Sequence, residues 1–431
     1  MKKLELKTLV CIIAIAYSFN SQAQYSWSQK ANFPGAARTE AACFSIGHYG
    51  YVGCGSHGLR TANYSDWWKW DQFTNRWSAI ASYPGQAQLG NTFFAIGNKG
   101  YCGLGISVAG TATDFWSYDP GTDTWTAMAP FPGEGRYSAF AFVIGTNAYI
   151  ICGNPGSPTY LTDCWKYNSL TNTWSQIADY PVFGLETNLF YSIGAYGYAG
   201  CGGTGSANTD VMYKYDTGAN TWTAIASVPV DTRSGLLCPA NFVLADTAYS
   251  VSGSGSLSSD FINTAFSYNP NANSWGYAET FPGIRCYYAV GFSIGNDGYV
   301  ATGNDSAGNP LAQLWQYAPG HCHSMGQGVL AEASANKSVE GVNTEEANKV
   351  NLNVYPNPSN GIVNFSYGNL TSGNANLIIT DVLGRTVSEY TLQGSQGNFR
   401  IDESHLSNGT YFYQITSKGI TLNTGKLMMA K

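Results

Sequence analysis

Four arginines stand at matching points of a sequence pattern that repeats along the chain, and acidic residues lie nearby. The arginines are Arg38, Arg136, Arg233 and Arg285, and the candidate acid–base carboxylates are Glu134, Glu186 and Asp231. A guanidinium group binds a carboxylate through two parallel hydrogen bonds, and a side-chain carboxylate can exchange protons with a bound sugar. The pattern therefore predicts a mouth that binds a sugar acid or a peptide carboxylate. The alternative stays open that these arginines pair locally and fix the chain where it enters each repeat.

Other catalytic and metal-binding patterns find little support. The triplet His-Cys-His at 321–323 has no second cluster at metal-ligand spacing. The stretch from Gly200 to Gly205 satisfies G-x-G-x-x-G, but no helical pattern follows it, so a dinucleotide site lacks its structural context. Between residues 24 and 320 the only histidines are His48 and His57, which argues against a Ser-His-Asp triad. We predict no metal and no cofactor.

Charge is scarce in this chain. Its 431 residues include 21 Lys and Arg against 27 Asp and Glu, a formal net charge of −6, which argues against nucleic acid as a partner. Three lysines in the first seven residues, an apolar run over 9–17 and the small residues Ser21 and Ala23 match a secretory signal peptide at 1–23. No later stretch has 18 consecutive apolar residues, so we predict no transmembrane span.

The body of the chain repeats one pattern six times, with a period of about 50 residues. Each repeat has a Trp, a turn with proline, an apolar stretch, a Tyr-led stretch that ends in glycine, and an alternating aromatic pair. The repeated tryptophans are Trp27, Trp77, Trp125, Trp174, Trp222 and Trp275. Four short strands per repeat predict the blades of a β-propeller, which cover one another with large side chains. The last repeat ends at Tyr317 without a Trp strand, so the strand around Trp27 should complete it.

The order of Arg, Tyr-x-x-x-Gly, Tyr-Asp and Trp resembles the kelch repeat. This resemblance implies an all-β fold with a six-bladed kelch-type propeller over residues 24–318. In such blades the segments between blades and the loops after each second strand lie on one face. Those loops differ in every repeat, at 56–65, 106–113, 154–162, 203–209, 254–263 and 304–312. Because variable loops on a rigid scaffold commonly carry binding sites, we expect the ligand on that face.

A second domain is expected at 350–431, after a polar linker at 319–349. Short strand-like runs separated by Gly and Asn turns favour a small Ig-like β-sandwich. Its motifs resemble the type A sorting domain of the type IX secretion system, and the motif residues are Tyr355, Pro356, Asn357, Pro358, Gly361, Gly384, Gly409 and Lys426. The resemblance implies the type IX machinery as a partner. It also implies export in a bacterium of the Bacteroidetes phylum, to the medium or the outer-membrane surface.

Two functional classes stay open for the propeller. We expect a monomeric secreted or cell-surface module that binds a protein or a glycan, because no catalytic set is recognisable. The alternative is a sugar epimerase or mutarotase resembling the sialic acid mutarotases, which are also six-bladed kelch propellers. A copper radical oxidase resembling galactose oxidase needs more histidines than His48 and His57 supply. A disulfide between Cys152 and Cys164, on consecutive strands of one blade, also stays open.

Overall fold

The computed structural model of the chain describes residues 25–319 and 351–429, apart from short gaps. The gaps are at 59–62, 86–88, 157–159, 186–188, 204–207, 230–235, 255–260, 356–358, 360, 369–373, 382–384, 395–396 and 418–419. The predicted signal peptide and linker residues 320–349 lie outside the described residues. Every element within the described ranges is a β-strand. No helix in these ranges is long and apolar enough to cross a membrane.

Six antiparallel four-stranded sheets follow one another along the chain and form the six blades. Blades 1 to 3 contain β2 (Ala42–Ile46), β3 (Tyr49–Gly53), β4 (Trp67–Asp71) and β5 (Arg76–Ile80); β6 (Thr92–Ile96), β7 (Lys99–Gly103), β10 (Phe115–Asp119) and β11 (Thr124–Ala127); and β12 (Phe140–Ile144), β13 (Asn147–Ile151), β14 (Cys164–Asn168) and β15 (Thr173–Ile177). The first strand of each blade is its innermost strand.

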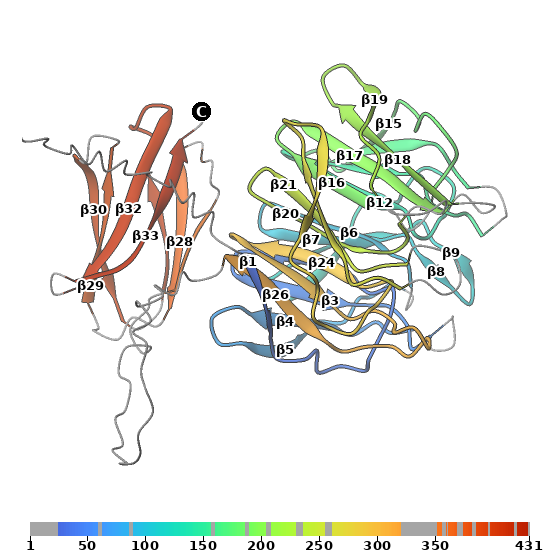
Figure 1. The fold of residues 1–431 in the computed structure, drawn as a ribbon, viewed down its shortest axis with the longest axis horizontal. Helices are drawn as coiled ribbons and strands as arrows, with labels where there is room; N and C mark the ends of the chain where they lie inside the picture. The colour runs from blue at the N-terminus through green and yellow to red at the C-terminus, as the bar shows by residue number, and fades with distance from the viewer. Residues whose placement is uncertain are drawn as a thin grey trace, which may run out of the picture.

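Blades 4 to 6 repeat this order. They contain β16 (Leu189–Ile193), β17 (Tyr196–Gly203), β18 (Asn208–Asp216) and β19 (Thr221–Ile225); β20 (Ala240–Leu244), β21 (Thr247–Val251), β22 (Ala265–Asn269) and β23 (Ser274–Ala278); and β24 (Val290–Ile294), β25 (Asp297–Ala301) and β26 (Leu314–Pro319) with β1 (Tyr25–Gln29). The innermost strands contact one another in a closed circle, from β2 through β6, β12, β16, β20 and β24 back to β2. The six sheets therefore form a complete ring (Figure 1).

The N-terminal strand completes the sixth blade. β1 pairs antiparallel with β26, and Trp27 lies opposite Tyr317. In Figure 1 the dark blue β1 lies beside the orange β26, although almost the whole propeller separates them in sequence. This pairing covers the strand edge that β26 would otherwise present, and an exposed edge is a template for aggregation.

Neighbouring blades pack through aromatic rings set against very small residues. Gly100 in β7 faces the ring of Phe44 in blade 1, and a Cβ at Gly100 would lie 2.1 Å from that ring. The same contact recurs at Gly50 against Phe292 and at Gly298 against Phe242. A glycine at the second position of these strands thus lets the next blade approach closely.

Two features depart from a uniform blade. A short hairpin of β8 (Ile106–Ser107) and β9 (Gly110–Thr111) lies in the loop after β7. In blade 4, β17 and β18 extend further than their counterparts and pair through an irregularity between Gly200 and Gly202. The first two glycines of the G-x-G-x-x-G match, Gly200 and Gly202, thus belong to a strand and its irregularity and not to a phosphate-binding turn, while Gly205 lies outside the described residues.

The C-terminal domain consists of two sheets around one apolar core. One sheet contains β27 (Asn351–Tyr355), β28 (Ile362–Gly368) and β31 (Gly397–Asp402), and the other contains β29 (Asn374–Thr380), β30 (Thr386–Gln393), β32 (Gly409–Ser417) and β33 (Ile420–Met429). Phe365 from the first sheet and Leu377 and Ile415 from the second are fully buried in this core. The predicted all-β fold, a six-bladed propeller followed by a small β-domain, is confirmed.

Candidate functional site

One face of the propeller, here called the loop face, carries the segments between blades and the loops after each second strand. This follows from the antiparallel order, because the chain reaches each innermost strand and leaves each second strand at the same end. The opposite face carries tight turns such as the one between Ile46 and Tyr49. Candidate binding residues must therefore come from the loop-face ends of the strands.

Residues with left-handed backbone recur at the loop-face ends of the described innermost strands. Just before the innermost strand, five blades place a residue with φ between +51° and +63°: Glu40, Gly90, Ser138, Cys238 and Tyr288. Their backbones are bonded from blade to blade: Ser138 N donates to Gly90 O at 2.8 Å, and Tyr288 N donates to Cys238 O at 3.0 Å. Left-handed backbone costs about 1–3 kcal/mol at a non-glycine residue and is concentrated at functional sites.

A cavity of about 100 Å³ lies among these residues. It is lined by Glu40, Ala41, Gly90, Asn91, Phe93, Ser138, Ala139, Phe140, Ala141, Phe190, Cys238, Pro239, Tyr288, Ala289 and Val290, so all six blades contribute. The rings of Phe140 and Phe190 stack at a centroid distance of 5.9 Å. Glu40 is the acidic residue among the described residues of this lining.

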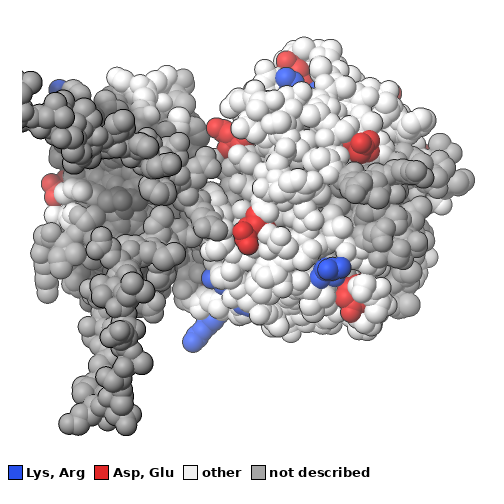
Figure 2. Space-filling view, viewed as in Figure 1, with Lys and Arg blue, Asp and Glu red and all other residues white. Residues whose placement is uncertain are grey.

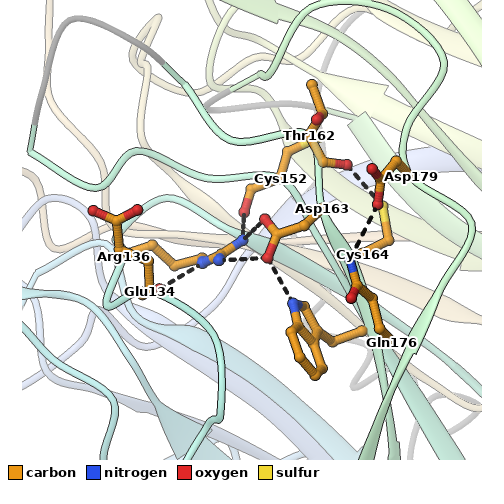
Figure 3. A network of polar contacts seen from close by, with 9 residues as sticks. Glu134, Arg136, Cys152, Thr162, Asp163, Cys164, Gln176 and Asp179 are labelled. Atoms are coloured by element: carbon orange, nitrogen blue, oxygen red, sulfur yellow. Dashed lines mark hydrogen bonds and ion pairs between the residues drawn. The ribbon is translucent and has the colours of Figure 1, made fainter.

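The described repeat arginines, Arg38, Arg136 and Arg285, are not among the residues that line this cavity. Arg136 is fully buried, and its Nε donates to Glu134 O at 2.9 Å, while Nη1 donates to Cys152 O at 2.9 Å. Both Nη atoms contact the carboxylate of Asp163, at 2.6 and 2.9 Å (Figure 3). One guanidinium group thus ties together the inter-blade segment, the end of the second strand and the start of the third strand.

Arg38 repeats this arrangement in blade 1. It is fully buried and donates to Ala36 O, to Cys54 O and to Asp66, at 3.0, 2.9 and 2.9 Å. Both guanidinium groups are thus enclosed and already bonded to carbonyl and carboxylate oxygens, which is the local pairing that the sequence left open as the alternative to ligand binding. A role of Arg38 and Arg136 in ligand binding stays a prediction.

The paired carboxylates are held in their charged form. Burial raises the pKa of Asp163, but hydrogen bonds from Arg136 and Trp165 and the guanidinium charge outweigh it, so the pKa lies below its usual value. Asp66 has a lowered pKa through the same balance, with Arg38 and Trp68 as the donors. Each carboxylate also fixes a tryptophan, since Trp165 Nε1 donates to Asp163 at 2.6 Å.

The remaining predicted residues are spread over different environments. Arg285 is exposed. In its blade, Gln313 stands at the position that Asp163 occupies in blade 3. The Gln313 side chain accepts a hydrogen bond from Ile284 N and donates one to Ile284 O, at 3.1 Å each. Glu134 is exposed, and its carboxylate points away from the Arg136 guanidinium (Figure 3). The other predicted site residues lie outside the described residues: Arg233, Glu186 and Asp231.

The structure adds a set of cavity residues that the sequence did not single out as a site. Phe93, Phe140 and Phe190 occupy the first or second position of their innermost strands, and Tyr288 lies two residues before β24. An alignment of the six repeats on their innermost strands would have placed these residues within four successive positions at the loop-face ends of those strands. The repeat arginines stood out instead, because charged residues are the more familiar mark of a binding site.

The described residues offer no evident centre for metal or thiol chemistry. No group of three His, Cys, Asp or Glu among them could hold a metal ion. Eight cysteines between Cys43 and Cys286 are buried free thiols, and Cys152 and Cys164 are among them. Burial raises the pKa of the Cys201 and Cys286 thiols to about 12 each, so both stay protonated and unreactive at neutral pH.

Comparison with known proteins addresses each part of the chain. Residues 353–429 match the family described as the secretion system C-terminal sorting domain. A solved structure described as "Structure of YjhT" has 17% sequence identity and a TM-score of 0.58, and the match covers 66% of this chain and 95% of that chain. No curated protein sequence matches significantly. The chain thus has a kelch-like β-propeller fold, and it carries a type IX sorting domain that implies export.

Proposed function

We propose that the propeller is a secreted or cell-surface binding module whose protein or glycan ligand docks on the loop face over the central cavity. The observation that supports this proposal is the cavity itself, which lies on the loop face and takes lining residues from all six blades. A concave, mostly apolar site with a few polar groups is the usual form of a binding site. Its left-handed backbone residues hold the lining in place before a ligand arrives.

The surface around the cavity supports contact with another molecule. Val108 in the β8–β9 hairpin, Phe183 before blade 4 and Ile284 before blade 6 all belong to the loop face, and their exposed fractions are 98%, 72% and 54%. Exposed apolar side chains are typical of the central part of a protein interface. On the side of the propeller that Figure 2 shows, Lys, Arg, Asp and Glu are few among uncharged residues.

Catalysis on a sugar acid has less support. A mutarotase-like reaction requires an arginine that holds the sugar carboxylate beside an acid–base carboxylate. Arg38 and Arg136 are enclosed, and Arg285 is the one described repeat arginine that reaches solvent. The similar solved structure has 17% identity, so it carries an argument about fold alone. We therefore propose binding without turnover.

The docking surface predicts a specific loss of binding. Purified protein is screened on a glycan and peptide array, and the best ligand is titrated against Val108→Asp and Ile284→Asp. We expect each variant to weaken binding at least tenfold, because a buried unpaired carboxylate is costly. Leu170→Asp is the matched control, since Leu170 is 77% exposed in the turn between β14 and β15 on the opposite face. Equal losses in all three variants would contradict docking on the loop face.

We also propose a two-step export, in which residues 1–23 direct the chain across the inner membrane and residues 350–431 direct it across the outer membrane. In this division, residues 24–318 form one folding unit and residues 319–349 a linker. Deletion of residues 350–431 should trap the propeller in the periplasm, whereas deletion of residues 2–23 should trap the whole chain in the cytoplasm. Cell fractionation with immunoblotting measures both. Normal surface levels of the first deletion variant would refute the role of the C-terminal domain.

A further inference from the structure

A contact between neighbouring blades recurs at one position of the repeat, the sixth residue counted from the start of each second strand. This residue has a left-handed backbone in all six blades, with φ between +52° and +61°, and its side chain is buried. Because the backbone conformation and the burial are shared, the six side chains occupy equivalent places between the blades. The residues at this position are Cys54, Leu104, Cys152, Cys201, Ser252 and Thr302.

The partner at this contact is the fourth residue of the second strand in the next blade. Leu104 of blade 2 and Ile150 of blade 3 belong to one buried cluster. Cys152 of blade 3 and Ala199 of blade 4 belong to another. The two repeat positions therefore come together where one blade packs against the next.

Between blades 1 and 2 both of these positions are cysteines. Cys54 and Cys102 are fully buried in one cluster, and the structure holds both as thiols. Burial and a hydrogen bond between the two thiols raise the pKa of Cys102 well above its usual value. The two sulfur atoms thus lie side by side. Cys152 also has a thiol neighbour, but this is Cys164 of its own blade, so that pair joins no two blades.

The chain meets the conditions under which such a pair is oxidised. Its sorting domain implies export, and disulfides form and persist outside the reducing cytoplasm. A protonated thiol inside the closed blade contact reacts slowly, because the thiolate is the nucleophile. Oxidation therefore comes before blade 2 packs against blade 1, while the exported chain folds.

We propose that Cys54 and Cys102 form a disulfide bond in the exported protein and thereby link blade 1 to blade 2. One cysteine thiolate attacks a disulfide of the oxidant, which is a disulfide oxidoreductase or oxidised glutathione, and the second thiolate then displaces the oxidant from the mixed disulfide. The two cysteines lose two protons and two electrons, and the oxidant leaves with its disulfide reduced to two thiols. This bond lies inside the ring of blades, so its formation does not depend on the loop-face ligand.

The test maps the disulfides of the full chain after export. Free thiols are alkylated in denaturant, the protein is digested without a reductant, and mass spectrometry assigns the linked cysteines from fragment ions. We expect a peptide with Cys54 linked to a peptide with Cys102. The same chain held in the cytoplasm by deletion of residues 2–23 should show both cysteines alkylated instead. Alkylation of both cysteines in the exported chain, or a bond from either to another cysteine, would overturn the inference.

Cys54→Ser measures what the bond contributes to stability, with Cys201→Ser as the matched control. Cys201 occupies the position of Cys54 in blade 4, but Ser250 stands at the position of Cys102 in blade 5, so the equivalent bond cannot form there. Both substitutions replace a fully buried thiol by a hydroxyl, and Ser252 already occupies this position in blade 5. The bond closes a loop of about 50 residues, which restricts the unfolded chain. We expect Cys54→Ser to lower the melting temperature by at least about 5 °C more than Cys201→Ser does.

Cys102→Val provides a second variant, because valine already occupies this strand position at Val52 and Val300. It should remove the linked peptide and lower the melting temperature of the exported protein by about as much as Cys54→Ser. If neither variant melted below Cys201→Ser, no bond would link the two blades.

Discussion

Replacing Arg136 by methionine should lower the free energy of unfolding by about 3 kcal/mol, because breaking a buried ion pair leaves an uncompensated charge. This value is at the lower end of the usual range, since the side chain of Asp163 keeps 26% of its surface exposed and can be partly hydrated. The carbonyl oxygens of Glu134 and Cys152 also lose their donor. Chemical denaturation of the purified protein measures the change.

Arg285→Met is the matched control for this prediction. The two arginines occupy the same repeat position, but Arg285 is exposed, so its replacement should change stability by less than about 0.5 kcal/mol. Equal effects of the two substitutions would contradict the structural role of Arg136. If instead Arg136→Met left stability unchanged and abolished ligand binding, the arginine would belong to the binding site after all.

The ion pair also predicts a dependence of stability on pH. Because the pKa of Asp163 is lowered on folding, its contribution is present above the unfolded value of about 3.9 and is lost as the pH falls through the folded pKa. Asp163→Asn removes that titration. The variant should therefore be less stable than the parent at pH 7, and the difference between them should shrink below about pH 4.

Much of the propeller could be predicted because each repeat carries a complete set of local signals. The period of the tryptophans set the number of blades, and the missing Trp strand after Tyr317 identified the strand around Trp27 as its replacement. These signals are strong because every outer strand carries a Trp and every Tyr-led stretch ends in a glycine with positive φ. Six copies of one pattern also reduce the chance that a single misleading residue misassigns a strand.

The candidate binding site was harder to predict, because the position of a residue in the repeat does not determine whether its side chain is buried or exposed. Arg136 and Arg285 are equivalent in sequence, yet one is enclosed and the other exposed. The difference lies about 27 residues later, where Asp163 provides a carboxylate and Gln313 provides an amide. Likewise, Glu40, Ser138 and Tyr288 share a left-handed backbone without sharing any chemical property that marks it in the sequence.

A circle of indole hydrogen bonds shows how each outer strand is attached to the blade before it. Trp77 Nε1 donates to Ala31 O at 2.8 Å, and Trp125, Trp174, Trp222 and Trp275 each donate at 2.9–3.0 Å to an alanine carbonyl of the preceding inter-blade segment. Trp27 closes the circle, because its Nε1 donates to Glu279 O at 2.9 Å, 252 residues later in the chain. The ring is thus joined by the same bond at its closure as at every other blade.

Deleting residues 24–32 should destabilise the propeller far more than removing the Trp27 side chain alone. The deletion removes β1, so β26 loses its backbone partner and Tyr317 loses its contacts with Tyr25 and Trp27, whose rings lie 4.9 and 4.7 Å away. Most of a domain's stability of about 5–15 kcal/mol would be lost. We expect aggregation or a melting temperature lower by more than about 10 °C, since each kcal/mol is worth about 2–4 °C at this size.

Trp27→Ala keeps the backbone pairing of β1 and should lower the free energy of unfolding by about 2–3 kcal/mol. This loss is smaller than for a fully buried Trp, because the Trp27 side chain is only partly buried. Trp275→Ala is the matched control, since Trp275 makes the equivalent indole bond inside the ring, to Ala226 O at 2.9 Å. The two substitutions should therefore have nearly equal effects in thermal unfolding of the full chain. If the deletion melted within a degree of the parent, β1 would not hold the ring closed, and β26 would have to be stable as an open edge.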